Sequence, residues 1–112
     1  NDYIISFYLC LGAGIWEEVL FRLIIFNFFI YFTSLFLKHS FITLFLPIFI
    51  SSVIFSLFHY IGSFSDTFTL YSFIIRFVGG VYLAVIYYYR GLGIAMFSHF
   101  IYDFLIVSYP LI

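Results

Sequence analysis

Two adjacent carboxylates and an arginine stand inside an apolar stretch of the sequence, at Glu17, Glu18 and Arg22. Glu18 and Arg22 are four residues apart, so on a helix they share a face and can form an ion pair. Glu17 is rotated by about 100° from Glu18, which frees its carboxylate for another partner. We expect Glu18 and Arg22 to fix the local geometry and Glu17 to act as a general base in a cavity. The alternative is a helix-stabilising ion pair with a spare acid at a membrane interface.

A histidine ends the sequence Phe55-Ser-Leu-Phe-His59. An imidazole can act as a base, move a proton or ligate a metal. Phe55 lies one helical turn before His59, where its ring could pack against the imidazole. Alone, a histidine at a helix end is more often an interfacial residue, so His59 indicates catalysis only together with partners from elsewhere in the chain.

A second histidine, His99, is followed four residues later by Asp103. This spacing places both side chains on one helical face. Asp103 could orient His99, bind a metal with it, or line an oxyanion site when it is protonated. The alternative is a buried polar pair that holds membrane helices together.

The amino-acid composition indicates the class of protein that positions these side chains. The 112 residues are 66% hydrophobic and 8% charged, whereas soluble domains are about 45–50% apolar and about 25% charged. A soluble domain of this size could not bury so much apolar surface, and disorder needs the opposite composition. The net charge of −1 offers no basic patch for nucleic acid. The composition therefore favours an integral membrane protein that spans the lipid bilayer several times.

The hydrophobic pattern predicts an all-α fold, a polytopic transmembrane helical bundle with about four spans. The expected spans are residues 13–37, 41–58, 70–89 and 91–109, each close to the roughly 20 residues that a bilayer requires. Residues 3–11 are apolar but too short, and we interpret them as the tail of an upstream span or as an interfacial piece.

Charged residues inside these spans are informative because each raises the free energy of membrane insertion by about 2.5–3.5 kcal/mol at the centre of a membrane helix. Such residues face the protein interior or water, and by default they mark function. Only Arg76, one or two turns from the end of its span, has an alternative interpretation as a solvated surface residue.

We expect one domain, residues 1–112, because neither a repeat nor a linker interrupts the pattern. The chain begins with Asn1 rather than Met, and its first apolar run lacks the basic start of a signal peptide. We therefore interpret it as the core of a longer membrane protein whose upstream spans are missing. Richness in Phe, Ile and Tyr with little Ala is typical of an AT-rich genome and hints at a bacterial plasma membrane.

The three motifs EExxxR, FxxxH and HxxxD, in this order on separate hydrophobic spans, resemble the CPBP family of intramembrane proteases. That family contains the CAAX prenyl endopeptidases and the bacteriocin-processing or self-immunity proteins, also called Abi. The resemblance covers nearly the whole chain and rests on Glu17, Glu18, Arg22, Phe55, His59, His99 and Asp103.

This resemblance implies a glutamate-dependent intramembrane endopeptidase that needs no metal or other cofactor. In the family, the first glutamate and the histidine of the second motif activate a water molecule, here Glu17 and His59. The third motif forms the oxyanion site, here His99 and Asp103, and the remaining Glu–Arg pair supports it. The implied substrate is a membrane-associated protein or peptide, of CAAX type or bacteriocin-processing type.

One position departs from the family, whose third motif often ends in Asn where this chain has Asp103. An ionised Asp would repel a developing oxyanion, so Asp103 must be protonated, act through a water molecule, or orient His99.

Two other hypotheses about the site as a whole remain open. Two histidines with carboxylates could hold Zn²⁺, although H-E-x-x-H is absent. The polar cluster could also serve a non-catalytic immunity protein or an ion relay.

Straight spans pose a geometric problem. If they connect on one side, at Lys38 and Arg90, the helical rise places Glu17 about 30 Å from that side and His99 about 13 Å from it. A shared site therefore requires tilted, offset or kinked helices, and Pro47 is one place where a kink can form.

Overall fold

The computed structural model describes residues 2–38, 40–61 and 67–108, and the described part of the chain is helical without any strand. This confirms the predicted all-α fold. The helices are α1 (Asp2–Glu18), η1 (Val19–Phe26), α2 (Asn27–Phe36), α3 (Ser40–Phe58), α4 (Leu70–Arg90) and α5 (Leu92–Ser108).

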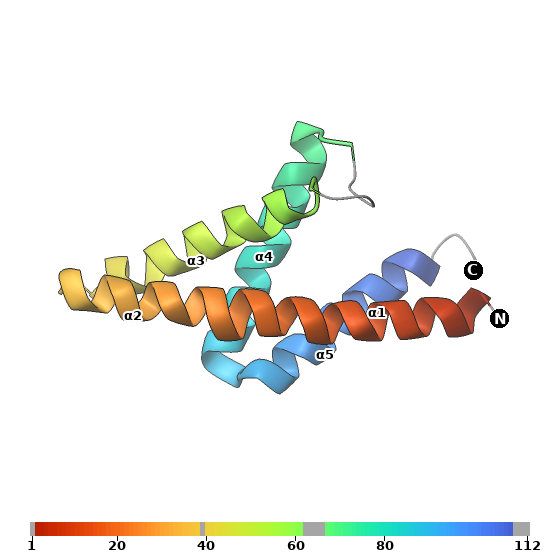
Figure 1. Cartoon of the computed structure of the whole chain (residues 1–112), viewed down its shortest axis with the longest axis horizontal. Coiled ribbons are helices and arrows are strands. Elements are labelled where there is room, and N and C mark those ends of the chain that lie inside the picture. The colour runs from red at the N-terminus through yellow and green to blue at the C-terminus, as the bar shows by residue number, and fades with distance from the viewer. Residues whose placement is uncertain (1, 39, 62–66, 109–112) are drawn as a thin grey trace.

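The first three elements form one continuous helical rod, red to orange in Figure 1. Glu18 and Asn27, at the two junctions, both have helical dihedral angles, so the chain does not turn there. Between them η1 is wound as a π-helix, a form with i→i+5 hydrogen bonds that is frequent at functional sites. The rod therefore changes its winding, and not its direction, immediately after the two glutamates.

The rod corrects the expectation that residues 3–11 form a separate piece before a span that begins near residue 13. The glycines between them do not interrupt α1, because a helix tolerates an internal glycine at about 1 kcal/mol. Gly14 instead permits a close helix crossing. A Cβ atom added there would lie 3.0 Å from the Met96 carbonyl oxygen and 3.2 Å from the Phe100 Cβ atom, both on α5.

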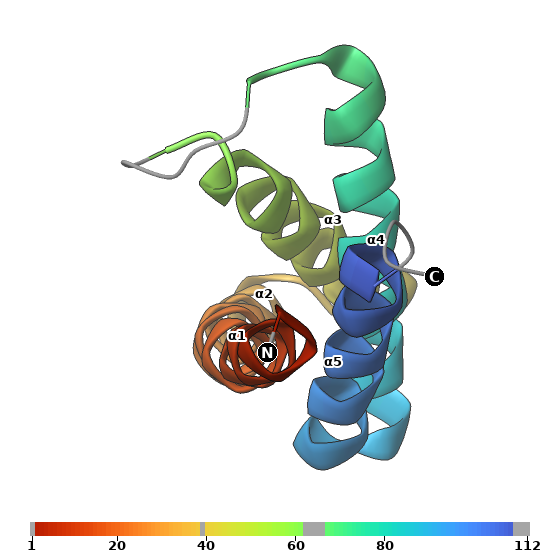
Figure 2. The same ribbon diagram turned by 90° about the vertical axis from the view of Figure 1, so that its right-hand side faces the viewer.

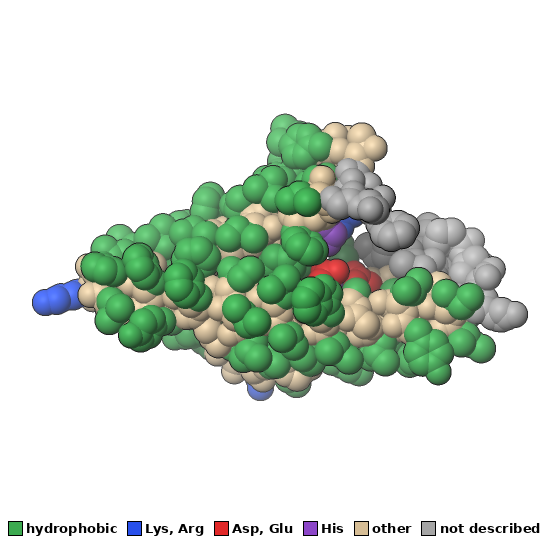
Figure 3. All heavy atoms as spheres, in the orientation of Figure 1, with side chains coloured by type: hydrophobic (Ala, Val, Ile, Leu, Met, Phe, Trp, Pro, Cys, Tyr) green, Lys and Arg blue, Asp and Glu red, His purple; other side chains and the backbone are tan. Residues whose placement is uncertain are grey.

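Three helices of the described chain are long and apolar enough to cross a membrane, at Tyr3–Phe36, Phe41–Phe58 and Leu70–Arg90. The apolar stretch of α5, Leu92–Leu105, is shorter. Large apolar side chains also dominate the outer surface, green in Figure 3. These features confirm a polytopic membrane bundle.

The other helices lie on one side of the rod, which Figure 2 shows almost end-on. The helix α3 packs against α2, α4 packs against α3, and α5 runs along α1. One residue, Gly91, joins α4 to α5; its φ of +91° belongs to the left-handed region that favours glycine. The Gly91 N–H donates to the Tyr87 carbonyl at 2.9 Å, which closes the end of α4.

The two connections between spans do not lie on one side of the molecule. The α2–α3 connection is at one tip of the rod. The helix α4 instead crosses the rod steeply and turns into α5 on the side of the rod opposite α3, near the middle of the rod's length (Figure 1). The assumption of straight spans joined at a common level is therefore wrong. Because α5 runs back along α1, His99 reaches the middle of the rod, where Glu17 lies.

Candidate active site

Glu18 and Arg22 form a buried pair that joins three helices. Arg22 Nε lies 3.3 Å from Glu18 Oε1, and the two side chains are 1% and 0% exposed. Arg22 Nη2 also donates to the Gly80 carbonyl on α4 at 3.2 Å. The guanidinium carbon is 4.9 Å from the centre of the Phe55 ring on α3. The ion pair that the spacing predicts thus also connects the rod to α3 and α4.

The second carboxylate oxygen of Glu18 contacts a residue of α5. Oε2 lies 2.7 Å from Nδ1 of His99 on α5, and His99 is 4% exposed. An ionised carboxylate can only accept a hydrogen bond, so Nδ1 donates. Glu18 therefore fixes both the guanidinium of Arg22 and the orientation of the His99 ring.

Glu17 lies between the two histidines. Its Oε1 is 3.7 Å from His59 Nε2 and 3.5 Å from His99 Nε2, and its side chain is 18% exposed. These distances exceed those of a direct hydrogen bond. Among the described residues, Glu17 Oε1 is a buried atom without a hydrogen-bond partner. Such an atom marks a functional position or a site for an ordered water molecule.

His59 follows the last residue of α3 and is oriented by the backbone of its own turn. Its Nδ1 lies 2.8 Å from the Phe55 carbonyl oxygen. A carbonyl only accepts, so Nδ1 carries a proton and the lone pair of the neutral ring lies on Nε2. That nitrogen faces Glu17. The Phe55 ring packs edge-on against His59, with 5.0 Å between the ring centres, as the spacing predicts.

Asp103 completes the cluster from one turn further along α5. Its Oδ2 lies 3.2 Å from His99 Nε2, and its side chain is 31% exposed. The same nitrogen of His99 therefore faces both Asp103 and Glu17. All seven residues of the three motifs meet through these contacts.

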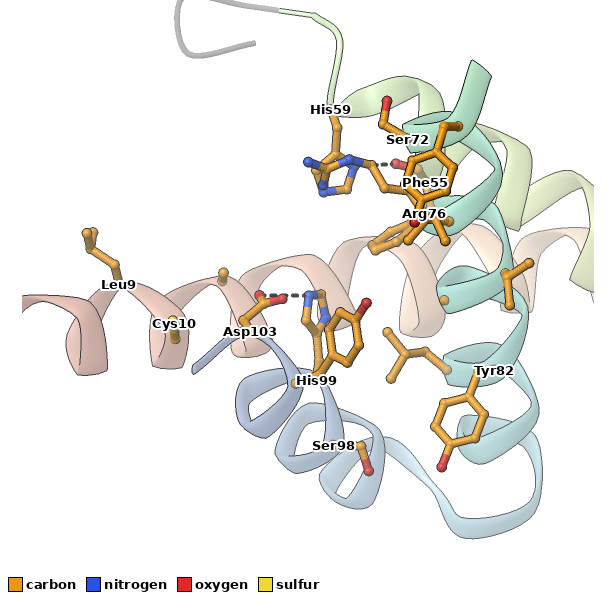
Figure 4. Close-up of a pocket in the computed structure, with 17 residues that line it drawn as sticks. Leu9, Cys10, Phe55, His59, Ser72, Arg76, Tyr82, Ser98, His99 and Asp103 are labelled. Atoms are coloured by element: carbon orange, nitrogen blue, oxygen red, sulfur yellow. Dashed lines mark hydrogen bonds and ion pairs between the residues drawn. The ribbon is translucent and has the colours of Figure 1, made fainter. Parts of the chain in front are cut away.

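A cavity of about 1120 Å³ opens beside the cluster. His59 and Arg76 lie on one side of it in Figure 4, and His99 and Asp103 lie on the other. In Figure 3 acidic and histidine side chains reach the surface together, in a hollow between the rod and the end of α3. The residues that line the cavity are Leu9, Cys10, Ala13, Phe55, His59, Tyr71, Ser72, Ile75, Arg76, Val78, Gly79, Tyr82, Leu83, Ser98, His99, Tyr102 and Asp103.

The family model described as Rce1-like, type II CAAX prenyl endopeptidase Rce1-like, matches residues 1–105. The chain belongs to this family. No curated protein and no solved structure matches it. Membership confirms the resemblance that the three motifs predict, and it makes the Rce1-like chain a membrane protease, and so a hydrolase.

The Rce1-like chain shows no group of three or more His, Cys, Asp or Glu side chains placed to hold a metal ion, as far as its described residues extend. The zinc hypothesis thus remains a prediction for experiment.

Two further residues of the Rce1-like chain contact the site or line the cavity without belonging to the three motifs. The Gly80 carbonyl anchors Arg22. Arg76 was open to interpretation as a surface residue, but it lines the cavity. The charge of Arg76 within an apolar span was a signal for this position, whereas nothing in the sequence distinguishes the Gly80 carbonyl from its neighbours.

Proposed function

We propose that this chain is a glutamic endopeptidase that hydrolyses a peptide bond of a membrane-associated protein or peptide, within or near the bilayer. The observation that carries the proposal is the position of Glu17. Its buried Oε1 lacks a hydrogen-bond partner among the described residues and lies 3.5 and 3.7 Å from the Nε2 atoms of His99 and His59. A carboxylate between two imidazoles can act as a general base.

In the first step, a water molecule would donate one hydrogen bond to Glu17 and one to the lone pair of His59 Nε2. Its oxygen then attacks the scissile carbonyl carbon while Glu17 accepts the proton. The proton moves to the amide nitrogen of the leaving peptide when the C–N bond breaks, which restores the Glu17 carboxylate. The hydrogen bond from His59 Nδ1 to Phe55 supports this role, because it presents the lone pair to Glu17.

In the same step, negative charge develops on the carbonyl oxygen of the substrate. We assign its stabilisation to His99 and Asp103, since hydrogen-bond donors held in a fixed position lower the energy of such an oxyanion. In this assignment the His99 ring is doubly protonated, because Nδ1 donates to Glu18 and Nε2, which faces Glu17, must donate to the oxyanion. Asp103 contacts that same nitrogen, so it acts as a protonated donor, through a water molecule, or by orienting the ring.

The proposed substrate is of CAAX type or bacteriocin-processing type, and the proposed location is the bacterial plasma membrane. The mostly apolar lining of the cavity supports a lipid-associated substrate, because apolar walls favour apolar ligands.

The test is cleavage of prenylated and leader-type peptides by the membrane-inserted protein. We expect Glu17→Gln and His59→Ala each to lower kcat by about 10²- to 10⁴-fold, the contribution of a general base. Lys38→Gln is the control, because the exposed Lys38 lies outside the cavity. Normal cleavage by both site variants, with insertion verified, would refute the assignment.

We also propose that the reaction needs no metal or other cofactor. Purified protein treated with a strong chelator should cleave at its original rate, and its metal content should be substoichiometric. A stoichiometric ion whose removal stops cleavage would instead establish the zinc-dependent mechanism.

A further inference from the structure

One histidine of the proposed reaction centre lies in a turn beyond the end of its helix. The helix α3 ends at Phe58, and His59 follows it. The backbone N–H groups of His59, Tyr60 and Ile61 each donate to the carbonyl three residues earlier, at 3.3, 3.0 and 3.3 Å. Such i→i+3 bonds have poorer geometry than those of an α-helix, and helix ends fray. The position of the His59 ring therefore depends on what else holds this turn.

The residue after His59 connects the turn to α4. The Tyr60 hydroxyl lies 2.5 Å from Ser72 Oγ. Ser72 lines the cavity, and Figure 4 shows it on the same side as His59. The Tyr60 ring also packs edge-on against Phe68, just before α4, with 5.1 Å between the ring centres. The Tyr60 side chain thus joins the end of α3 to the beginning of α4.

The hydrogen bonds around Ser72 determine which of the two hydroxyls donates. Ser72 Oγ lies 3.1 Å from the Thr69 carbonyl oxygen, which can only accept. A hydroxyl has one proton, so Ser72 donates to Thr69 and accepts from Tyr60. The Ser72 N–H also donates to Oγ1 of Thr69, the N-cap of α4, at 3.1 Å. The Tyr60 hydroxyl is therefore bound to a side chain that the first turn of α4 already fixes.

A second hydrogen bond joins the same face of α3 to α4. Ser56 Oγ donates to the Phe73 carbonyl at 2.9 Å. Ser56 and Tyr60 are four residues apart, so they project from one side of the helix end. Loss of the Tyr60 hydroxyl would leave the Ser56 bond in place. The packing of α3 on α4 should then survive, while the turn that contains His59 is released.

We propose that Tyr60 is a positioning residue of the endopeptidase, whose hydrogen bond to Ser72 holds the His59 ring beside Glu17. The effect on cleavage rests on the proposed function. Tyr60 is not among the residues that line the cavity, so it acts through His59, whose Nε2 lies 3.7 Å from Glu17 Oε1. A misplacement of about 1 Å in a reacting group can lower a rate by about 10²-fold.

The first test is Tyr60→Phe, which removes one oxygen atom and keeps the ring that packs on Phe68. With the prenylated and leader-type peptides, we expect kcat to fall by about 3- to 10-fold, the effect of losing one hydrogen bond, while KM stays unchanged. Tyr89→Phe is the matched control, because the exposed Tyr89 lies at the other end of α4 and outside the cavity. A Tyr60→Phe variant with the kcat of the wild type, even one of lower thermal stability, would overturn the inference.

The partner of Tyr60 provides a second pair of variants. Ser72→Ala should lower kcat at least as much as Tyr60→Phe does, and Ser72→Thr should retain more activity because it keeps a hydroxyl. Adding Tyr60→Phe to Ser72→Ala should have no further effect, since the bond between them is already absent. Losses that multiply in the double variant would show that the two hydroxyls act independently, and would overturn the pairing.

Nuclear magnetic resonance separates this inference from the proposed function, because it requires no cleavage. The histidines carry a heavy nitrogen isotope, and the signals of His59 are those lost in His59→Ala. Because His59 Nδ1 donates to the Phe55 carbonyl, the wild type should show one protonated and one unprotonated ring nitrogen. Tyr60→Phe should partly average the two signals. That change supports the positioning role even if neither protein cleaves a peptide, and unchanged signals overturn it even if both do.

Discussion

Asp103 is the residue at which this chain differs from the usual pattern of its family, and its contact with His99 limits its roles. Oδ2 lies 3.2 Å from His99 Nε2, and the side chain is 31% exposed at the cavity wall. A substrate oxygen that approaches His99 from the cavity therefore also approaches Asp103. An Asp in this position donates to an oxyanion only as a protonated acid, whereas as an anion it acts through a water molecule or orients His99.

We expect Asp103→Asn to separate these roles. An amide donates a hydrogen bond without titrating, so if Asp103 acts as a protonated acid, the variant stays within about tenfold of wild-type activity. The measurement is kcat/KM for both proteins with the same peptide substrate. A variant that loses activity by much more than tenfold would show that Asp103 acts as an anion.

At the scale of elements, close approaches between helices place the motifs within reach of one another. Gly80 allows α4 to approach α3: an added Cβ atom would lie 3.1 Å from Phe55 Cδ2 and 3.3 Å from Ser52 Cα. The neighbouring Gly79 has open space, with no atom within 4 Å of such a Cβ atom. The two adjacent glycines therefore differ in their expected response to the same substitution.

We expect Gly80→Ala to destabilise the protein by about 1–3 kcal/mol, the range for overpacking a well-packed contact, and to lower activity by shifting the carbonyl that binds Arg22. Gly79→Ala should be neutral or stabilising by up to about 1 kcal/mol through helix propensity. Thermal unfolding in detergent measures both variants. Equal effects of the two substitutions would show that the α3–α4 contact does not depend on Gly80.

At the scale of the whole molecule, three apolar helices and a largely apolar outer surface require lipid around the protein. The few charges of the described spans gather mainly at the site, where Arg22 contacts α3 and α4, and Glu18 contacts His99 on α5. Such a surface has no stable arrangement in water, because its apolar area would stay exposed.

We expect the protein to remain in the membrane pellet after extraction with alkaline carbonate, and to enter solution only with detergent. Alkali removes proteins held by charge and leaves those held by burial in hydrocarbon. Immunoblots of pellet and supernatant give the result, with a peripheral membrane protein as the control. Release into the alkaline supernatant would contradict the spanning assignment.

Contacts within a motif could be predicted from the sequence, whereas contacts between motifs could not. The Glu18–Arg22 and His99–Asp103 pairs follow from the geometry of one helical turn. The hydrogen bond between Glu18 and His99 joins residues 81 positions apart in the sequence. Helical periodicity relates only residues within a few turns, so it does not predict this contact. Only the family resemblance indicated that the three motifs share one site.

The continuous rod and its π-helix were also beyond prediction. The continuity of α1 through Gly14 could not be predicted, because the helix that Gly14 packs against, α5, lies far away in the sequence. The residues of η1 are equally compatible with α-helical winding, and its buried side chains contact distant helices, Phe21 at Phe55 on α3 and Arg22 at Gly80 on α4. Patterns of single helices contain no information about such contacts.

The position of the glutamates in the rod also has a mechanical consequence. Glu17 and Glu18 lie near its midpoint, with about 25 Å of helix on each side at ~1.5 Å per residue. One arm is held by α5 and the other by α3. Bilayers of different thickness change the tilt of a long helix. We therefore expect the acyl-chain length of the surrounding lipids to change the tilt of the rod, and with it the distance from Glu17 to His59 and His99.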